Sequence, residues 1–128
     1  VNFTGAVPPN QVAEILSRHD ALVLCSRSEG RPNVMLEAMA SARVVISTAL
    51  PGVVELIEHN RTGLLFPVGD IKSLTANIEK LVENPSFGVE LGRAARERIL
   101  SGGLTWESSS ECYYQVYLSA MNPAGGEH

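Results

Sequence analysis

The chain has 128 residues, of which 10 are Lys or Arg and 14 are Asp or Glu, so its formal net charge is −4 with neutral histidines. With 45% hydrophobic and 19% charged residues it can form a packed core, which excludes a disordered chain and a disulfide-stapled mini-protein. Acidic residues outnumber basic ones, and the Lys and Arg residues do not gather in one part of the sequence, which argues against nucleic-acid binding. The longest apolar runs, residues 21–25 and 44–46, are far shorter than the ~20 residues that cross a bilayer.

Short β-branched runs alternate along the chain with helix-length periodic segments. The predicted strands are residues 1–5, 22–25, 44–47 and 64–66, and the predicted helices are 8–18, 32–42, 53–58, 70–83, 84–100 and a last one from 105. Such alternation predicts an α/β fold with an open, mostly parallel sheet and right-handed crossovers. The unalternated apolar run at 22–25 is typical of a parallel strand covered on both faces.

Two helices have specific packing expectations. Asp70 is placed to cap the helix over 70–83, and the apolar stripe expected to face the core is Ile71, Leu74, Ile78, Leu81 and Val82. In the last helix, the residues predicted to pack inward are Tyr113, Tyr114, Tyr117 and Leu118.

The organisation along the chain is predicted to be one domain over residues 1–121 and a flexible tail over 122–128, which contains Pro123 and two glycines. The chain opens with Val1 directly on a strand-like segment, so we expect it to be a piece of a larger protein. No signal-peptide pattern begins at Val1, and Cys25 and Cys112 are predicted to be buried small hydrophobic residues. These features predict a reducing, cytoplasmic location.

Two segments at the carboxyl ends of predicted strands, residues 26–34 and 48–55, have unusual chemistry, and ligands of open parallel sheets bind at such ends. A helix that begins near Pro32 leaves the amides of Asn33, Val34 and Met35 unpaired, and its dipole adds partial positive charge. Gly30 lets a ligand approach the backbone closely and permits a positive φ. A phosphate or diphosphate fits there. The same turn occurs in proteins that bind nothing, so the residues alone leave both interpretations open.

Three carboxylates lie near this predicted anion site. Glu37 lies about one and a half turns into the helix and leans toward its N-terminus, so it can reach the hydroxyls of a ribose. Glu29, in the loop, is placed to accept hydrogen bonds from a sugar. Glu55 is read as a sugar contact or as a first-turn cap, and the helix dipole alone also favours acidic residues at such positions.

The arginines near the loop and the three histidines are weaker candidates for ligand or metal binding. Arg27 and Arg31 flank the loop and are either phosphate contacts or solvated side chains. The three histidines are scattered and predict no metal site: His19, His59 and His128.

The segment SRSEGRPNVMLEAMA, residues 26–40, resembles the E-x7-E signature of the retaining, GT-B-fold glycosyltransferases of family 4, the glycosyl transferases group 1. The similarity continues through residues 44–48, 52–55, 62–70, 91–98 and 105–107, so it covers nearly the whole chain. The resemblance implies a Rossmann-like parallel sheet with helices on both faces, the C-terminal half of a GT-B fold. Its implied partners are a nucleotide-sugar donor and an N-terminal acceptor-binding domain encoded upstream.

The resemblance also implies residue roles. The first Glu of the signature, here Glu29, is expected at the catalytic centre beside the donor sugar, and the second, Glu37, is expected to hold the ribose. Taken together, the predicted donor-binding residues are Gly30, Asn33, Val34, Met35, Glu37, Gly52, Val53 and Glu55. The reaction implied is sugar transfer with retention from a UDP-, GDP- or ADP-sugar, with neither metal nor cofactor, and the full-length enzyme is compatible with peripheral membrane association. This chain alone is expected to be inactive.

One departure keeps an alternative open. The family has Gly-Gly-x-Pro-Glu where this chain has Pro51-Gly52-Val53-Val54-Glu55, so the loop near the donor sugar is altered and the identity of the sugar and base stays open. A non-catalytic nucleotide-sugar binding module is therefore the alternative function. A receiver-like or flavodoxin-like domain is disfavoured, because Asp20 precedes its strand instead of following it.

Overall fold

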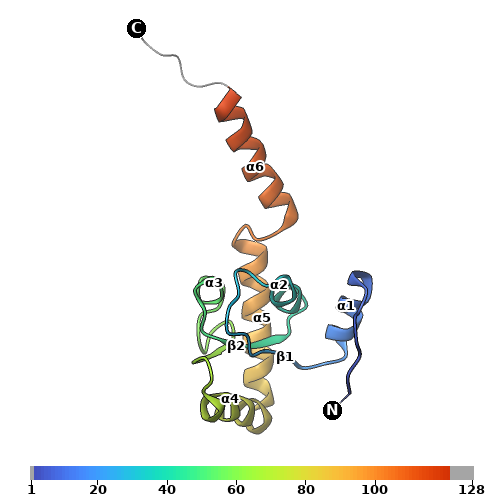
Figure 1. The fold of residues 1–128 in the computed structure, drawn as a ribbon, viewed down its shortest axis with the longest axis vertical. Coiled ribbons are helices and arrows are strands. Elements are labelled where there is room, and N and C mark those ends of the chain that lie inside the picture. The colour runs from blue at the N-terminus through green and yellow to red at the C-terminus, as the bar shows by residue number, and fades with distance from the viewer. Residues whose placement is uncertain (1, 122–128) are drawn as a thin grey trace.

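A computed structural model describes residues 2–121, and its centre is a parallel sheet with helices around it (Figure 1). The strands β1 (Ala21–Leu24), β2 (Val44–Thr48) and β3 (Leu64–Phe66) pair in the order β1-β2-β3. The helices are α1 (Pro9–Ser17), α2 (Asn33–Ala40), α3 (Pro51–Val54), α4 (Ile71–Glu83), α5 (Pro85–Ser101) and α6 (Trp106–Met121). The predicted α/β class and parallel sheet are confirmed, and so is the order of the elements from α1 onward.

The sheet is covered on both faces, because alternate residues of the central strand β2 enter two different apolar clusters. Val45 packs in the cluster that includes residues of α1, α2, α3 and α5, whereas Val44 and Ile46 pack in the cluster of β3 and Leu91. All five residues of β2 are buried. Helix α5 contributes to both clusters, through Leu91 on one side and Ala95 on the other, so it holds the two layers together.

Strand β1 is an edge strand, and this corrects three predictions. Residues 2–5 form no strand, so β1 pairs with β2 alone. Val23 is 41% exposed, so the strand is not covered on both faces as predicted. Cys25 follows the last strand residue and lies exposed in the loop, so its predicted burial is wrong.

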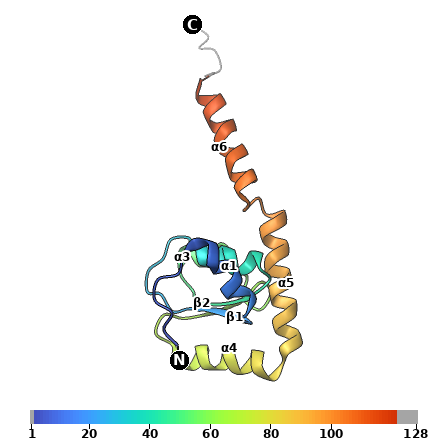
Figure 2. The ribbon, with the colours of Figure 1, turned by 90° about the vertical axis from the view of Figure 1, so that its right-hand side faces the viewer.

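Helix α6 starts where predicted but extends away from the rest of the domain (Figures 1 and 2). Tyr113, Tyr114 and Tyr117 are 79%, 56% and 64% exposed, so the prediction that they pack inward is wrong. Cys112 on the same helix is exposed as well. These tyrosine side chains are therefore not covered by other residues of the segment 2–121. The predicted tail, 122–128, lies outside the described residues.

Helix α4 ends at Glu83 as predicted, yet only part of its apolar stripe reaches the core. Leu74 and Leu81 pack against the cluster of β3, whereas Ile71 and Val82 are 76% and 73% exposed. The helix therefore lies over the edge of the sheet with one side of the stripe open to solvent. Within residues 2–121, no helix has both the length and the apolar character needed to cross a membrane.

The cap of α4 gives a testable pH dependence. The Asp70 carboxylate accepts hydrogen bonds from Ser73 N at 3.0 Å and Ser73 Oγ at 2.7 Å, and these bonds hold the pKa of Asp70 below its ordinary value. Because the folded pKa is the lower one, the stabilisation is present above the unfolded pKa and is lost as pH falls through the folded pKa. We expect Asp70→Ala to lower the melting temperature at neutral pH and Asp70→Asn, which keeps an acceptor, to lower it less.

The matching measurement is thermal unfolding of wild type and both variants from pH 7 downward. The gap between wild type and Asp70→Ala is expected to close in acid, below the ordinary aspartate range. A gap that stays constant into that acid range would contradict the assignment of the stabilisation to the ionised cap.

Candidate functional site

The loop between β1 and α2 ends in an exposed helix N-terminus. Pro32 is the N-cap and α2 starts at Asn33, one residue later than predicted. The amides of Asn33 and Val34 have no acceptor among the described residues. Met35 N donates to Pro32 O at 3.1 Å, so the predicted free amide at Met35 is wrong. Two free amides and the positive end of an eight-residue helix remain as the anion-binding feature.

Two loops far apart in the sequence interlock beside this helix. Thr48 Oγ1, at the end of β2, donates to Ser26 O at 2.8 Å. The backbone of Gly52 contacts that of Gly30 so closely that a Cβ on Gly52 would lie 1.8 Å from Gly30 O. Only glycine fits at position 52. The two segments singled out in the sequence, 26–34 and 48–55, therefore meet at one end of the sheet.

The loop residues around Gly30 are open to solvent. Ser26 Oγ donates to Glu29 Oε1 at 2.8 Å, which orients an otherwise exposed carboxylate. A Cβ at Gly30 would meet nothing within 4 Å, so a ligand has free access to this backbone. Gly30 has no positive φ, hence its role here is close approach and not a left-handed turn.

Glu55 differs from its predicted place. Helix α3 ends at Val54, so Glu55 lies at the C-cap and is not a first-turn cap. Its Oε2 lies 3.6 Å from Arg31 Nη2, an ion pair between half-exposed side chains that links the two loops. Arg98 Nη2 on α5 donates to the carbonyl of Glu55 at 2.8 Å.

Val53 lies under this loop. Its side chain is fully buried and its amide donates to Leu50 O at 2.9 Å. Val53 therefore fixes the loop from below and presents neither its side chain nor its amide to a ligand.

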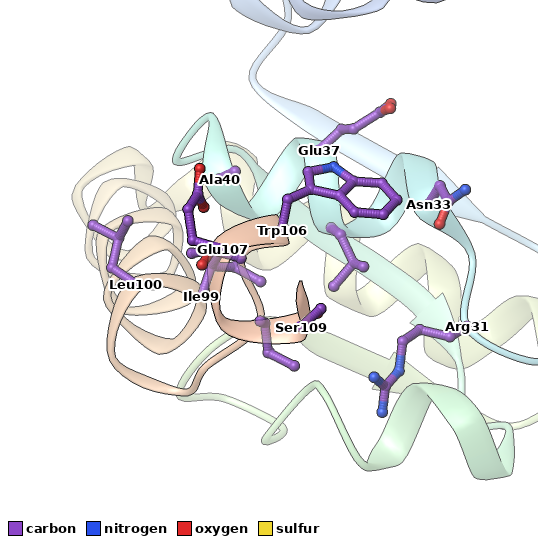
Figure 3. Close-up of a pocket in the computed structure, with 12 residues that line it drawn as sticks. Arg31, Asn33, Glu37, Ala40, Ile99, Leu100, Trp106, Glu107 and Ser109 are labelled. Carbon is purple, nitrogen blue, oxygen red and sulfur yellow. The ribbon is translucent and has the colours of Figure 1, made fainter. Parts of the chain in front are cut away.

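Glu37 lies on the exposed side of α2 and lines a groove of about 490 Å³, with its carboxylate pointing away from Ile99 and Leu100 (Figure 3). Its carboxylate makes no hydrogen bond or ion pair to any residue in the described part of the chain. The groove runs from Arg31 and Asn33 along α2 to the end of α5 and the start of α6. Trp106 lines the same groove. An aromatic residue at a helix start is compatible both with core packing and with ligand stacking, so the sequence alone does not identify this role.

A smaller cavity, of about 190 Å³, lies at the carboxyl ends of all three strands. Its lining includes Arg27, Thr48, Phe66 and Asp70. It places Arg27 at the same end of the sheet as the interlocked loops. Within residues 2–121, no group of three or more His, Cys, Asp or Glu is placed to hold a metal ion.

Comparison with known proteins decides the family. The model of the family described as "Glycosyl transferases group 1" matches residues 1–98. The chain belongs to this family.

Three similar proteins, one known by sequence and two by structure, are each much longer than this chain. It is 30% identical over 118 residues to glycogen synthase of Mycobacterium tuberculosis, covering 92% of the chain and 28% of that protein. Sucrose-phosphate synthase from Thermosynechococcus elongatus superimposes with a TM-score of 0.90 at 28% identity, covering 96% of the chain and 31% of the synthase.

A variant of Staphylococcus aureus TarM, solved with fondaparinux, alpha-GlcNAc-glycerol and UDP, superimposes with a TM-score of 0.74 at 28% identity. The match covers 84% of the chain and 22% of TarM. The chain thus spans less than a third of the length of each of these relatives. The predicted family and the Rossmann-like fold of a GT-B C-terminal domain are confirmed.

Proposed function

We propose that this chain is the donor-binding half of a retaining glycosyltransferase of family 4, which moves a sugar from a nucleoside diphosphate sugar to an acceptor. The observation that carries the proposal is the pair of free amides, Asn33 and Val34, at a helix start flanked by Glu29 and Glu37. Family membership and the UDP in the TarM structure support a nucleoside diphosphate as the ligand. Acceptor recognition is assigned to a second domain encoded upstream.

The helix start binds the diphosphate in this proposal. Amide donors and the helix dipole act most strongly on the charge that develops on the leaving diphosphate, so they lower the barrier without a metal ion. Arg31 is available to assist, because its ion pair with Glu55 spans 3.6 Å between half-exposed side chains, and such pairs are weak. A diphosphate would compete with Glu55 for this guanidinium.

The two glutamates of the signature have separate tasks. Glu37, whose carboxylate has no partner in the described chain, accepts the two ribose hydroxyls. Glu29, held by Ser26 at 2.8 Å, faces the donor sugar. They are not the acid and nucleophile pair of a retaining hydrolase, because the ribose occupies one of them.

The direct test is an amide-resolved NMR titration of the chain with UDP, GDP and ADP. Shifts at Gly30, Asn33 and Val34 with one of the three would support the site and identify the base. No shift with any nucleotide, even after the upstream half is added, would overturn the proposal.

Glu37→Gln is expected to weaken binding of that nucleotide roughly 10-fold or more, because a neutral amide replaces a charged acceptor of two hydroxyls. Glu79→Gln on α4, another exposed helical glutamate without a side-chain partner among residues 2–121, is the control and should bind as wild type does. Equal affinities of wild type and Glu37→Gln would remove the ribose role from Glu37.

Catalysis is tested separately in the full-length protein. Transfer to an acceptor with the donor's anomeric configuration kept is the expected result. Nucleotide-sugar binding without transfer would favour the alternative of a non-catalytic binding module, for which the altered loop at Gly52 is the structural reason.

A further inference from the structure

The groove beside Glu37 has an aromatic wall that the proposed donor site does not use. Trp106, the first residue of α6, is 88% exposed and lines the groove opposite α2. In Figure 3 its indole extends from the start of α6 over α2, toward the side chains of Asn33 and Glu37. A large apolar ring held at such exposure is available for a ligand.

The chemistry around the indole selects the kind of group that fits. The polar side is formed by Asn33 and Glu37, whose side chains have no partner in the described structure. The apolar side includes Leu36 and Leu104, which are only partly buried. Glu37 and Glu107 make this part of the groove acidic, whereas Arg31 lies toward the anion-binding helix start, where it is proposed to assist the diphosphate. A flat neutral group that carries hydroxyl donors is therefore favoured over a phosphate.

The groove is continuous with the anion-binding helix start, because Asn33 belongs to both. A ligand whose diphosphate lies on the amides of Asn33 and Val34 has two arms. One arm can reach the interlocked loop at Glu29 and Gly52, where the donor sugar is proposed to lie. The other arm follows α2 past Glu37 and arrives under the indole.

We propose that Trp106 forms the outer wall of the nucleoside-binding side of the site and stacks on the nucleoside whose ribose Glu37 holds. This inference rests on the proposed donor-binding function. It assigns a ligand contact to the start of α6, a helix from which no described residue belongs to either apolar core cluster. Stacking on an indole is tolerant of the base, so Trp106 adds affinity and leaves the choice of base to other residues.

The test uses the fact that the chain has one tryptophan, so its indole N–H gives one NMR signal that reports on Trp106 alone. UDP and UMP, which share the nucleoside, are expected to shift this signal. Glucose 1-phosphate, which has the sugar and a phosphate but no nucleoside, is expected to leave it unchanged. A shift with glucose 1-phosphate and none with UMP would overturn the proposal in favour of a sugar-binding groove.

Substitution gives an independent measurement. Trp106→Ala is expected to weaken UDP binding roughly 5- to 100-fold and Trp106→Phe to restore most of the affinity, because stacking needs a ring face. Tyr113→Ala is the matched control, since Tyr113 is a 79% exposed aromatic residue of the same helix outside the groove. Equal UDP affinities of wild type and Trp106→Ala would overturn the proposal.

Failure of this inference is distinguishable from failure of the proposed function. If the amides of Gly30 and Asn33 shift with UDP while the indole signal does not, the donor site stands and the role of Trp106 is wrong. If neither responds to UDP, GDP or ADP, even after the upstream half is added, the donor site itself is wrong.

Discussion

Gly92→Ala is expected to destabilise the domain by about 3 kcal/mol, at the upper end of the usual cost of overpacking. Gly92 is buried on α5, and a Cβ there would lie 2.2 Å from Ala42 O and 2.9 Å from the carbonyl carbon of Ala42. The turn after α2 cannot easily move away. Ala42 already has a φ of 55°, and Arg43 N donates to Ala38 O at 2.9 Å. The substitution must therefore push α5 off a turn that both layers depend on.

Gly88→Ala is the control for this prediction. It lies one turn earlier on the same helix, and its Cβ would meet its nearest neighbour, Leu81 Cδ2, at an ordinary 3.5 Å. Alanine there is expected to stabilise the domain by about 0.5–1 kcal/mol through its better helix propensity. Denaturant unfolding of both variants measures the contrast. Similar free energies of unfolding for the two variants would show that α5 and the turn are not in contact at Gly92.

Gly52→Ala is expected to remove most nucleotide binding while the domain stays folded. The Cβ would lie 1.8 Å from Gly30 O, so the loop of residues 49–55 and the loop that carries Glu29 must separate. Both loops are at the surface, so we expect a loss of stability of about 1–3 kcal/mol, less than for Gly92→Ala. UDP affinity should fall at least roughly 10-fold, because the diphosphate and sugar contacts depend on the relative position of these loops.

Gly30→Ala is the control variant on the other side of the contact between Gly30 and Gly52. A Cβ at Gly30 enters open space, so its melting temperature should match that of wild type. Any loss of UDP affinity in Gly30→Ala therefore measures how closely the ligand approaches the backbone. Wild-type UDP affinity in Gly52→Ala would show that the contact between the loops does not shape the site.

Helix starts are well predicted from the residues at and next to them. Prolines and caps decide helix starts by hydrogen bonding within a few residues, so Asp70 and Asn84 begin their helices as expected. The start of α2 was placed to within one residue by Pro32. The signature residues 26–40 also fixed the family, which the match over residues 1–98 confirms.

The errors concern the surroundings of these elements. The tyrosines of α6, the stripe of α4 and Cys25 were all expected to be buried, because an apolar pattern shows which face of an element prefers burial. It does not show whether anything lies opposite that face. Tyr113 at 79% and Ile71 at 76% exposure are the consequence.

Periodicity and short motifs are enough to predict the parallel α/β class, the order of elements from α1 onward, the family and the two segments expected to meet a ligand. The folded chain was needed to show that Gly30 touches Gly52, that Arg31 pairs with Glu55, and that Trp106 and Glu37 line one groove. Each of these contacts joins residues more than 20 positions apart. Their distances follow from how the layers pack, and no local propensity encodes them.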